Sequence, residues 1–287
     1  MVTRLHRHEL SVAERYDRLN GGRSAWSAVA RWLCSPLGAF FVNTPLYLLP
    51  AEINLQPRHR VLEVGCAHGA GLRFLTARFP FRQPPVGVDA SLEALSRGAR
   101  TWSNARVPLV TATASRLPFA PESFDLVLAG HTVRHLSDEG LLRFLFEAER
   151  VLRPGGRVLM VEPAITWGST LFYRLLHHEP VRTSADVLMD GTPDPGRDPY
   201  DSNQAIPTLL ATRDRDRFHR LFPDLRVARV DWFSFAAYPL SGGFKPWSLV
   251  GEGVARHMLR LERALEPALG RFAAFRMLLI VEKASER

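Results

Sequence analysis

The sequence predicts an α/β protein built on a doubly wound, mostly parallel sheet of seven strands with helices on both faces. Five short apolar segments before residue 164 alternate with amphipathic segments of helical length. This alternation indicates parallel strands that are buried on both faces. Two more strand-like segments lie late in the chain and complete the count of seven.

The expected strands are short, apolar and bounded by glycine, proline or charged residues. They are Val61–Val64, Val86–Val88, Val107–Val110, Phe124–Ala129, Arg157–Val161, Val227–Phe235 and Phe275–Val281. We expect the last of them to close the sheet.

The segments between the strands have apolar residues at helical spacing. Ser91 and Ser137 precede two of them at the position of an N-cap, where a side-chain oxygen accepts a backbone N–H. Pro154-Gly155-Gly156 is expected to end a helix in a structural turn. The expected helices are Leu72–Phe79, Leu92–Trp102, Asp138–Leu152, Leu171–His177, Pro207–Leu221 and Leu249–Leu269.

The composition is that of an ordinary globular protein. Of the 287 residues, 46% are apolar and 23% are charged, which excludes collagen-like, coiled-coil and low-complexity chains. Cys34 and Cys66 make no disulfide framework, and no cysteine and histidine cluster has zinc-site spacing, so we expect no metal. We expect a cytoplasmic protein, because the opening residues carry charges where a signal peptide is apolar.

The charge balance is strongly basic, at +8 with an isoelectric point near 10.3. The arginines are scattered rather than gathered into a run with interleaved aromatics. The sequence therefore predicts no nucleic-acid partner, whereas an acidic substrate or an anionic membrane surface stays open. The uncharged segment Leu33–Ala51 contains Pro36, Pro45 and Pro50, which favours a helix, a turn and a second helix over a membrane span.

The segment with the strongest chemical signal is Glu63-Val64-Gly65-Cys66-Ala67-His68-Gly69, in which an expected strand runs into a glycine turn and then a helix. Gly65 permits a positive φ and a close approach of the backbone, and Gly69 lets the helix begin near a ligand. The carboxylate of Glu63, at the end of a buried strand, is costly unless it binds something. Dinucleotide enzymes use a similar turn, so this segment alone does not identify the cofactor.

Three further segments follow in order along the chain. Asp89 and Ala90 come at the end of the second strand, where a carboxylate accepts hydrogen bonds from ribose hydroxyls in many nucleotide folds. Thr113-Ala114-Ser115-Arg116-Leu117-Pro118-Phe119 follows the third strand. Glu149-Arg150-Val151-Leu152-Arg153-Pro154-Gly155-Gly156 joins a helix to the fifth strand.

Together, these segments resemble the motifs of class I S-adenosylmethionine-dependent methyltransferases of the small-molecule type, over about Arg58 to Pro163. The resemblance implies a Rossmann-like fold, S-adenosyl-L-methionine as cofactor, S-adenosyl-L-homocysteine as product, and methyl transfer as the activity. The sequence departs from the family pattern at Ala67, where glycine is usual, and at Thr113, where an acid is usual.

The resemblance also implies which residues bind the cofactor. Asp89 is expected to hold the ribose, Thr113 to accept a hydrogen bond from the adenine amino group, and the backbone amide of Ala114 to face the ring. The full set of expected cofactor-binding residues is Glu63, Gly65, Ala67, Gly69, Asp89, Ala90, Thr113, Ala114 and Gly130.

The candidates for catalysis follow the fourth and fifth strands, because ligands bind at the carboxyl ends of parallel strands. His131 and His135 are candidate bases, since an imidazole titrates near neutral pH. Glu162 is a candidate for orienting an amine or a hydroxyl. The alternatives are that His135 packs under the following helix and that Glu162 pairs with an arginine.

We expect three segments within one domain. Residues 1–56 form a helical lid over the substrate, residues 57–163 form the cofactor-binding core, and residues 164–287 add substrate-side insertions and the closing strands. The aromatic residues of the lid and the insertions favour a small apolar or aromatic acceptor, which reacts through oxygen, nitrogen or carbon.

Four other functions are alternatives. Arginines around Leu249–Arg271 also suit a membrane surface that presents a lipid-linked substrate. A non-catalytic binding or partner subunit is consistent with Ala67 and Thr113. A dehydrogenase is disfavoured because the G-x-G-x-x-G fingerprint is incomplete. A nucleic-acid methyltransferase is disfavoured because Gly-His-Thr-Val follows the fourth strand in place of an N/D-P-P-Y/F/W tetrapeptide.

Overall fold

The structure is a computed structural model that describes residues 55–77, 79–101, 107–136, 138–176, 180–188, 202–240 and 249–285. Almost all of the lid expected at residues 1–56 lies outside the described residues, as do the two helices expected within 33–51 and the N-cap expected at Ser137. No helix in the described part of the chain is long and apolar enough to cross a membrane.

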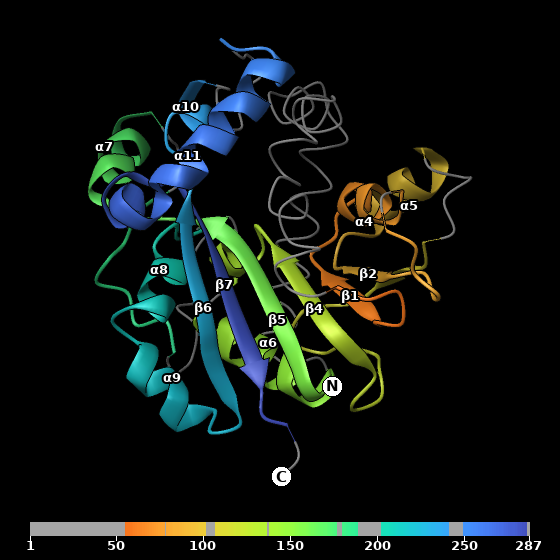
Figure 1. Cartoon of the computed structure of the whole chain (residues 1–287). Coiled ribbons are helices and arrows are strands. Elements are labelled where there is room, and N and C mark those ends of the chain that lie inside the picture. Colours follow the sequence, from red (N-terminus) through yellow and green to blue (C-terminus); the bar gives the residue numbers. More distant parts are fainter. Residues whose placement is uncertain are drawn as a thin grey trace.

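The centre of the fold is a mixed sheet of seven strands in the order β3-β2-β1-β4-β5-β7-β6 (Figure 1). The first five strands run parallel, which confirms the expected α/β class with its mostly parallel sheet. The strands are β1 (Val61–Val64), β2 (Val86–Asp89), β3 (Leu109–Thr111), β4 (Phe124–Gly130), β5 (Leu152–Pro163), β6 (Leu225–Phe233) and β7 (Arg276–Lys283).

The last strand does not close the sheet, so that expectation was wrong. β7 is antiparallel to both β5 and β6 and lies between them, which leaves β6 at the edge. The burial of the two strands explains this order. Residues 276–281 of β7 are all buried, as in a central strand, whereas β6 exposes Arg226 and Ala228 to solvent, as in an edge strand.

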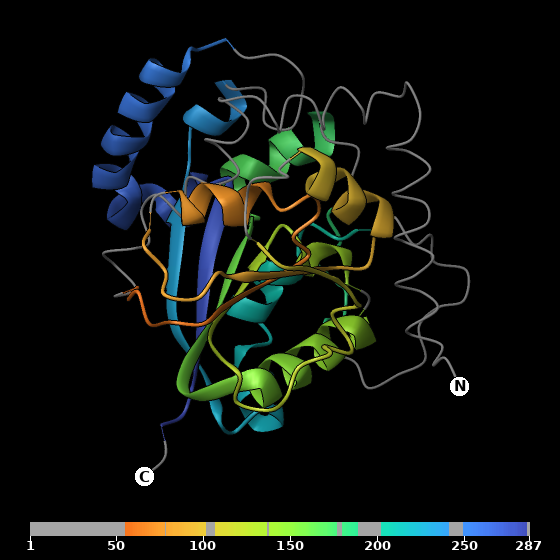
Figure 2. The same cartoon turned by 90° about the vertical axis from the view of Figure 1, so that its right-hand side faces the viewer.

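Helices connect the strands close to the expected places. α5 begins after Ser91, whose Oγ accepts the backbone N–H of Ala94 at 3.0 Å, so this expected N-cap is confirmed. Figures 1 and 2 show α10 and α11 beyond the end of the sheet where β4 and β5 finish. The described helices are α4 (Ala70–Thr76), α5 (Leu92–Thr101), the 3-10 turn η1 (Val133–His135), α6 (Asp138–Val151), α7 (Trp167–Leu176), α8 (Ile206–Ala211), α9 (Arg215–Leu221), α10 (Ala237–Leu240) and α11 (Glu252–Ala273).

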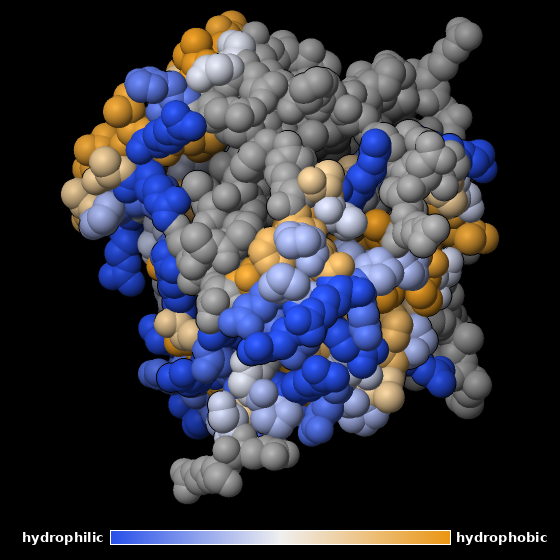
Figure 3. Space-filling model, turned by 45° about the vertical axis from the view of Figure 1, so that its right-hand side comes forward, coloured by the Kyte–Doolittle hydropathy of each residue, from blue (hydrophilic) through white to orange (hydrophobic). Residues whose placement is uncertain are grey.

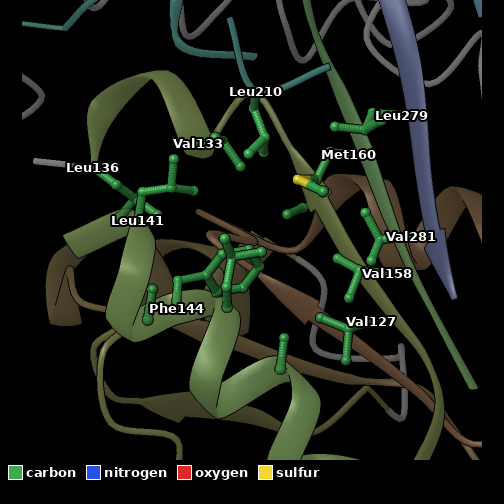
Figure 4. Close-up of a cluster of buried hydrophobic side chains, with 14 of the residues drawn as sticks. Val127, Val133, Leu136, Leu141, Phe144, Val158, Met160, Leu210, Leu279 and Val281 are labelled. Atoms are coloured by element: carbon green, nitrogen blue, oxygen red, sulfur yellow. The ribbon is translucent and has the colours of Figure 1, made fainter. Parts of the chain in front are cut away.

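Each face of the sheet carries its own apolar core, because successive side chains of a strand point to opposite faces. One face, which includes Val127 and Val158, packs against α6, α8 and α9 (Figure 4). The opposite face, which includes Leu126 and Leu159, packs against Leu75 of α4. The sheet is therefore covered by helices on both sides, as the sequence predicts.

The helix expected from Pro207 to Leu221 is divided into α8 and α9. Pro207 lies in the first turn of α8, where its missing N–H costs nothing. The backbone N–H of Asp214 donates to the carbonyl of Leu209 at 2.9 Å, a five-residue spacing that unwinds the chain between the two helices. Sequence periodicity carries no signal for such a local irregularity.

Two of the sequence motifs touch each other in the fold. The backbone N–H of Leu117 donates to Oε2 of Glu147 at 2.6 Å, and Arg150 donates to the carbonyls of Leu117 and Phe119 at 3.0 and 2.7 Å. Glu147 and Arg150 also form an ion pair of 2.8 Å. The end of α6 therefore holds the segment that follows β3.

Replacing Arg150 should release this segment. We expect Arg150→Met to lower the free energy of unfolding by about 1.5–3 kcal/mol, because hydrogen bonds from a charged donor to two carbonyls are lost. Chemical denaturation followed by circular dichroism measures the change. The control is Arg226→Met, which removes an exposed ion pair with Glu282 on the edge strand and should cost about 0–1 kcal/mol. Equal losses of unfolding free energy in the two variants would contradict the conclusion that Arg150 holds the segment after β3.

Candidate active site

The expected cofactor-binding residues converge at the carboxyl ends of the parallel strands. β2 and β4 pair with β1 on its two sides, so the turn after β1 lies between their ends. Asp89 ends β2 and Gly130 ends β4. The backbone N–H of Ala112 donates to the carbonyl of Asp89 at 3.1 Å, which brings the segment after β3 to the same edge.

The carboxylate of Asp89 holds the glycine turn in shape. Its Oδ2 accepts the backbone N–H of Ala67 at 2.7 Å, and its Oδ1 accepts the N–H of Ser91 at 2.8 Å. Ala67 has a φ of +48°, a left-handed conformation that costs an alanine more than a glycine. The bond to Asp89 compensates for the departure from the usual glycine at this position.

The glycine at position 65 is required by a protein contact. Gly65 has a φ of +75°, and a Cβ built on it would lie 2.1 Å from Oγ1 of Thr132. That hydroxyl donates to the carbonyl of Val64 at 3.1 Å or to that of Gly130 at 3.2 Å. The close backbone approach expected at Gly65 is therefore an approach to the loop after β4, which fixes that loop against β1.

Glu63 carries a buried carboxyl group beside this turn. Burial and the neighbouring charge of Asp89 raise the pKa of Glu63 to about 8, while a backbone hydrogen bond from Leu72 opposes the rise. Its Oε2 is buried, and none of the described residues donates a hydrogen bond to it. A buried polar atom without a partner is costly, so Glu63 is a candidate for binding a ligand.

These residues fit the cofactor that the motifs imply. The carboxylate of Asp89 lies at the end of β2, where a carboxylate that binds ribose hydroxyls is expected. Oε2 of Glu63 supplies a further acceptor. A Cβ built on Gly130 meets no atom within 4 Å, so the end of β4 leaves space beside the turn. Contacts between these residues and the cofactor stay predictions.

The remaining cofactor candidates lie around the same edge. Gly69 precedes α4 with a φ of +75°, and Ala90 directly follows β2. Thr113 and Ala114 are 2% and 9% exposed, and Oγ1 of Thr113 lies 3.2 Å from Oγ of Ser115. Binding of the adenine ring by this buried pair stays a prediction.

Glu162 organises the loop after β4. Its Oε1 accepts the backbone N–H groups of Thr132 and Val133, both at 2.7 Å, and its Oε2 lies 3.7 Å from Nη1 of Arg134. The fully buried carboxylate therefore caps the first turn of η1 and pairs with an arginine. These contacts match the arginine-pairing alternative, and orientation of a substrate by Glu162 stays a prediction.

The two candidate bases differ in environment. His131 has a φ of +57° and a buried ring, and burial together with Arg134, Arg276 and His135 holds its pKa well below the usual range. His131 is therefore neutral at pH 7. His135 lies within η1 and is half-buried. A catalytic role for either histidine stays a prediction.

Sequence reasoning missed a buried arginine beside the end of β5. Arg276 pairs with Pro163 in the sheet, is 2% exposed, and stands 5.2 Å from the ring centre of Phe233. Burial lowers its pKa to about 10, while Tyr238 and Tyr173 oppose the fall. The sequence did show an arginine inside the apolar segment FRMLLIV. An arginine is almost never fully buried unless its charge has a partner, so this position could have been singled out.

The chain is similar to known methyltransferases. Residues 61–156 match a protein family described as a methyltransferase domain. The chain is 40% identical over 106 residues to phthiotriol/phenolphthiotriol dimycocerosates methyltransferase 1 of Mycobacterium ulcerans, covering 36% of this chain and 37% of that protein. It is 32% identical over 130 residues to the ubiquinone/menaquinone biosynthesis C-methyltransferase UbiE of Geotalea daltonii, covering 44% and 54%. The chain thus spans 37% to 54% of the length of these relatives.

A solved structure reported for the conversion of a disulfide bond into a thioacetal group during echinomycin biosynthesis is also similar. It superposes with a TM-score of 0.54 and 15% sequence identity, over 96% of this chain and 94% of that one. At this identity the likeness is one of fold, and it extends beyond the matched motifs to nearly the whole chain.

The raised pKa of Glu63 predicts a pH-dependent stability. Between pH 4.5 and pH 8 the folded protein keeps a proton that the unfolded chain releases, so the free energy of unfolding falls as pH rises through this window. We expect a loss on the order of 2–5 kcal/mol from this group. Glu63→Gln should show a smaller fall, which is not zero because burial also raises the pKa of Glu266 to about 7. Denaturant titrations at both ends of the window measure it.

The control for this experiment is Glu122→Gln, because Glu122 is exposed in the loop before β4. This variant should keep the pH dependence of the wild type. A Glu63→Gln variant with the full wild-type pH dependence would contradict the assignment of the raised pKa to Glu63.

Proposed function

We propose that this chain, which carries a class I S-adenosylmethionine-dependent methyltransferase domain over residues 61–156, transfers the methyl group of S-adenosylmethionine to a small molecule. The observation that carries the proposal is the pair of carboxyl groups, Glu63 and Asp89, around the turn after β1. Both lie where ligands bind in this fold, at the carboxyl ends of the strands.

In this proposal the chain binds its cofactor through the expected set of residues. Asp89 accepts hydrogen bonds from the ribose, Thr113 and Ala114 bind the adenine, and Glu63 provides the buried acceptor beside the turn. The turn itself and the neighbouring small residues, Gly65, Ala67, Gly69, Ala90 and Gly130, allow the backbone to approach the ligand.

Alignment is the main task left to the protein, because the bound cofactor supplies a methyl group that its sulfonium charge already activates. Holding an acceptor in line with that methyl group is worth about 7–11 kcal/mol, and a general base adds about 10² to 10⁴-fold. The structure supports the first contribution more strongly than the second. His131 is neutral at pH 7 and is a weak base, because burial, together with Arg134 and Arg276, disfavours its charged form.

The same electrostatics favour an acceptor that reacts as an anion. Arg134 and Arg276 are buried at this edge, and the carboxylate of Glu162 faces the first of them. Burial is the larger cause of the lowered pKa of His131 and disfavours any ion, but the positive charge of Arg134 and Arg276, which adds to it, stabilises the ionised form of a phenol, an enol or a carbon acid. We therefore infer an oxygen or carbon acceptor of low pKa, in preference to an amine.

The acceptor is proposed to be apolar or aromatic. Phe172, Tyr173 and Tyr238 cluster around Phe275, with ring centres 5.2 to 6.0 Å from that ring. The names of the relatives, a phthiotriol/phenolphthiotriol dimycocerosates methyltransferase and a quinone biosynthesis C-methyltransferase, support a small biosynthetic acceptor for this chain. In the proposed division, residues 57–163 bind the cofactor, whereas residues 1–56 and 164–287 enclose the acceptor.

Two alternative functions can be distinguished from this proposal by experiment. One is a non-catalytic binding or partner subunit, which Ala67 and Thr113 would favour as signs of a relaxed cofactor site. The other is a methyltransferase that acts on a lipid-linked substrate at a membrane surface, which the exposed apolar residues of α7 and α11 favour.

Calorimetric titration of the purified chain with S-adenosylmethionine, S-adenosylhomocysteine and NAD tests the proposal. We expect saturable binding of the two adenosyl ligands and none of NAD. Binding of NAD alone would favour a dehydrogenase. Absence of binding to all three would favour the partner subunit.

Asp89→Ala should weaken S-adenosylmethionine binding by about 10- to 100-fold, because two hydrogen bonds to a charged acceptor are lost. Asp89→Asn, which keeps one carbonyl acceptor for the turn, should weaken binding less. Asp231→Ala is the control, since Asp231 pairs with Arg229 on the edge strand and should leave affinity unchanged. Wild-type affinity in a folded Asp89→Ala variant would contradict the ribose assignment.

An acceptor screen with methyl-labelled S-adenosylmethionine tests the inferred acceptor class. Phenols, enols and carbon acids should take up label faster than amines of similar size, because the buried arginines stabilise an anion. Arg276→Met should reduce that preference. A screen in which only amines are labelled would contradict the inferred class.

A further inference from the structure

The helix α11 has two apolar faces. Its inner face includes Ala255 and Gly270, which are buried against the rest of the fold. On the same side, the buried carboxylate of Glu262 accepts the backbone N–H groups of residues 235–237 at 2.7 to 2.9 Å. The inner face therefore anchors the helix to the segment that leads into α10.

The second apolar face points to solvent. It carries large side chains that are 45% to 66% exposed, namely Val254, Leu261, Leu265, Leu269 and Phe272. Their spacings of seven, four, four and three residues confine them to an arc of about 80° when each residue turns about 100°. Because the inner face already anchors α11, this outer stripe has no evident role in holding the fold together.

The neighbouring helix α7 extends the apolar surface. Trp167 is 87% exposed and Leu171, one turn later, is 65% exposed. A Cβ built on Gly168 would lie 3.3 Å from Cα of Ala273, so the start of α7 touches the end of α11. Hydrophobic atoms gather at the upper left of Figure 3, on the part of the molecule that α11 occupies.

Basic residues lie beside the apolar residues of α7 and on the polar side of α11. At about 100° per residue, Arg174 is on the side of Trp167 and Leu171, whereas the arginines of α11 are about 120° to 160° from the middle of the stripe. Arg260, Arg263 and Arg271 are exposed on α11, and Arg174 is exposed near the end of α7.

The acids of α11 are Glu252, Glu262 and Glu266. Glu266 is half-buried, and burial raises its pKa to about 7, so it opposes the charge of the arginines only in part at neutral pH. The whole chain has a net charge of +8. The surface thus combines the apolar stripe of α11, an exposed tryptophan and a net positive charge.

We propose that this outer surface of α11 and α7 docks on an anionic lipid bilayer, with the apolar stripe in the interface, Arg174 at the headgroups and the arginines of α11 on the polar face of that helix. A helix with one strongly apolar face and a basic polar face lies in the plane of such an interface, and tryptophan favours the same depth. Arginine side chains reach the headgroups while their stems cover apolar surface. The proposal stands on the surface alone and does not depend on methyl transfer.

Flotation of the full chain with vesicles tests the proposal. We expect binding to vesicles of equal parts phosphatidylcholine and phosphatidylglycerol, and much weaker binding to phosphatidylcholine alone. The double variant Leu265→Gln with Phe272→Gln should lower partition into anionic vesicles about tenfold or more, because two apolar side chains leave the interface. Both positions are exposed, so the variant should keep the circular dichroism spectrum and denaturation midpoint of the wild type.

The matched control is Leu92→Gln, which makes the same change at a 63% exposed leucine on α5 and should leave partition unchanged. Three results would overturn the proposal. These are no preference for anionic vesicles, an unchanged partition of the double variant, and an apolar stripe that instead holds two copies of the chain together. Light scattering of wild type and double variant detects the last case as a loss of dimer.

Discussion

The candidate site depends on one interaction, the pair of hydrogen bonds that the Asp89 carboxylate accepts from Ala67 and Ser91. The first bond holds the turn after β1 in a left-handed conformation, and the second fixes the start of α5. One side chain thus ties together two strands, a glycine turn and a helix. The same carboxylate is the group proposed to bind the ribose, so the shape of the turn and the proposed binding of the cofactor are linked through it.

The two sides of the site have opposite electrostatic character. Around β1 and β2, burial and the neighbouring Asp89 raise the pKa of Glu63, and the two carboxyl groups suit a ligand rich in donors. Around β4, β5 and β7, burial together with Arg134 and Arg276 lowers the pKa of His131. Glu162 links the two sides, since it holds the loop whose Thr132 packs against Gly65. An acceptor is proposed to bind on the basic side.

Local patterns in the sequence predicted the elements that local physics controls. The apolar strands and the cap at Ser91 follow from residue type and spacing, and the structure has both. The turn expected at Pro154-Gly155-Gly156 was wrong, because these residues lie inside β5, where the register with β4 shifts and Gly155 has a φ of +75°. The position of β7 between β5 and β6 depends on long-range pairing, and the burial of Arg276 depends on that position. The reason for a glycine at position 65 is likewise non-local, because Thr132 lies in a loop after another strand.

A crystal structure of the chain with S-adenosylhomocysteine tests the central claim most directly. The account predicts the ribose within hydrogen-bond distance of Asp89, the adenine beside Thr113 and Ala114, and a ligand atom within hydrogen-bond distance of Oε2 of Glu63. A ligand bound elsewhere, with the turn after β1 unchanged and Glu63 still without a donor, would contradict it.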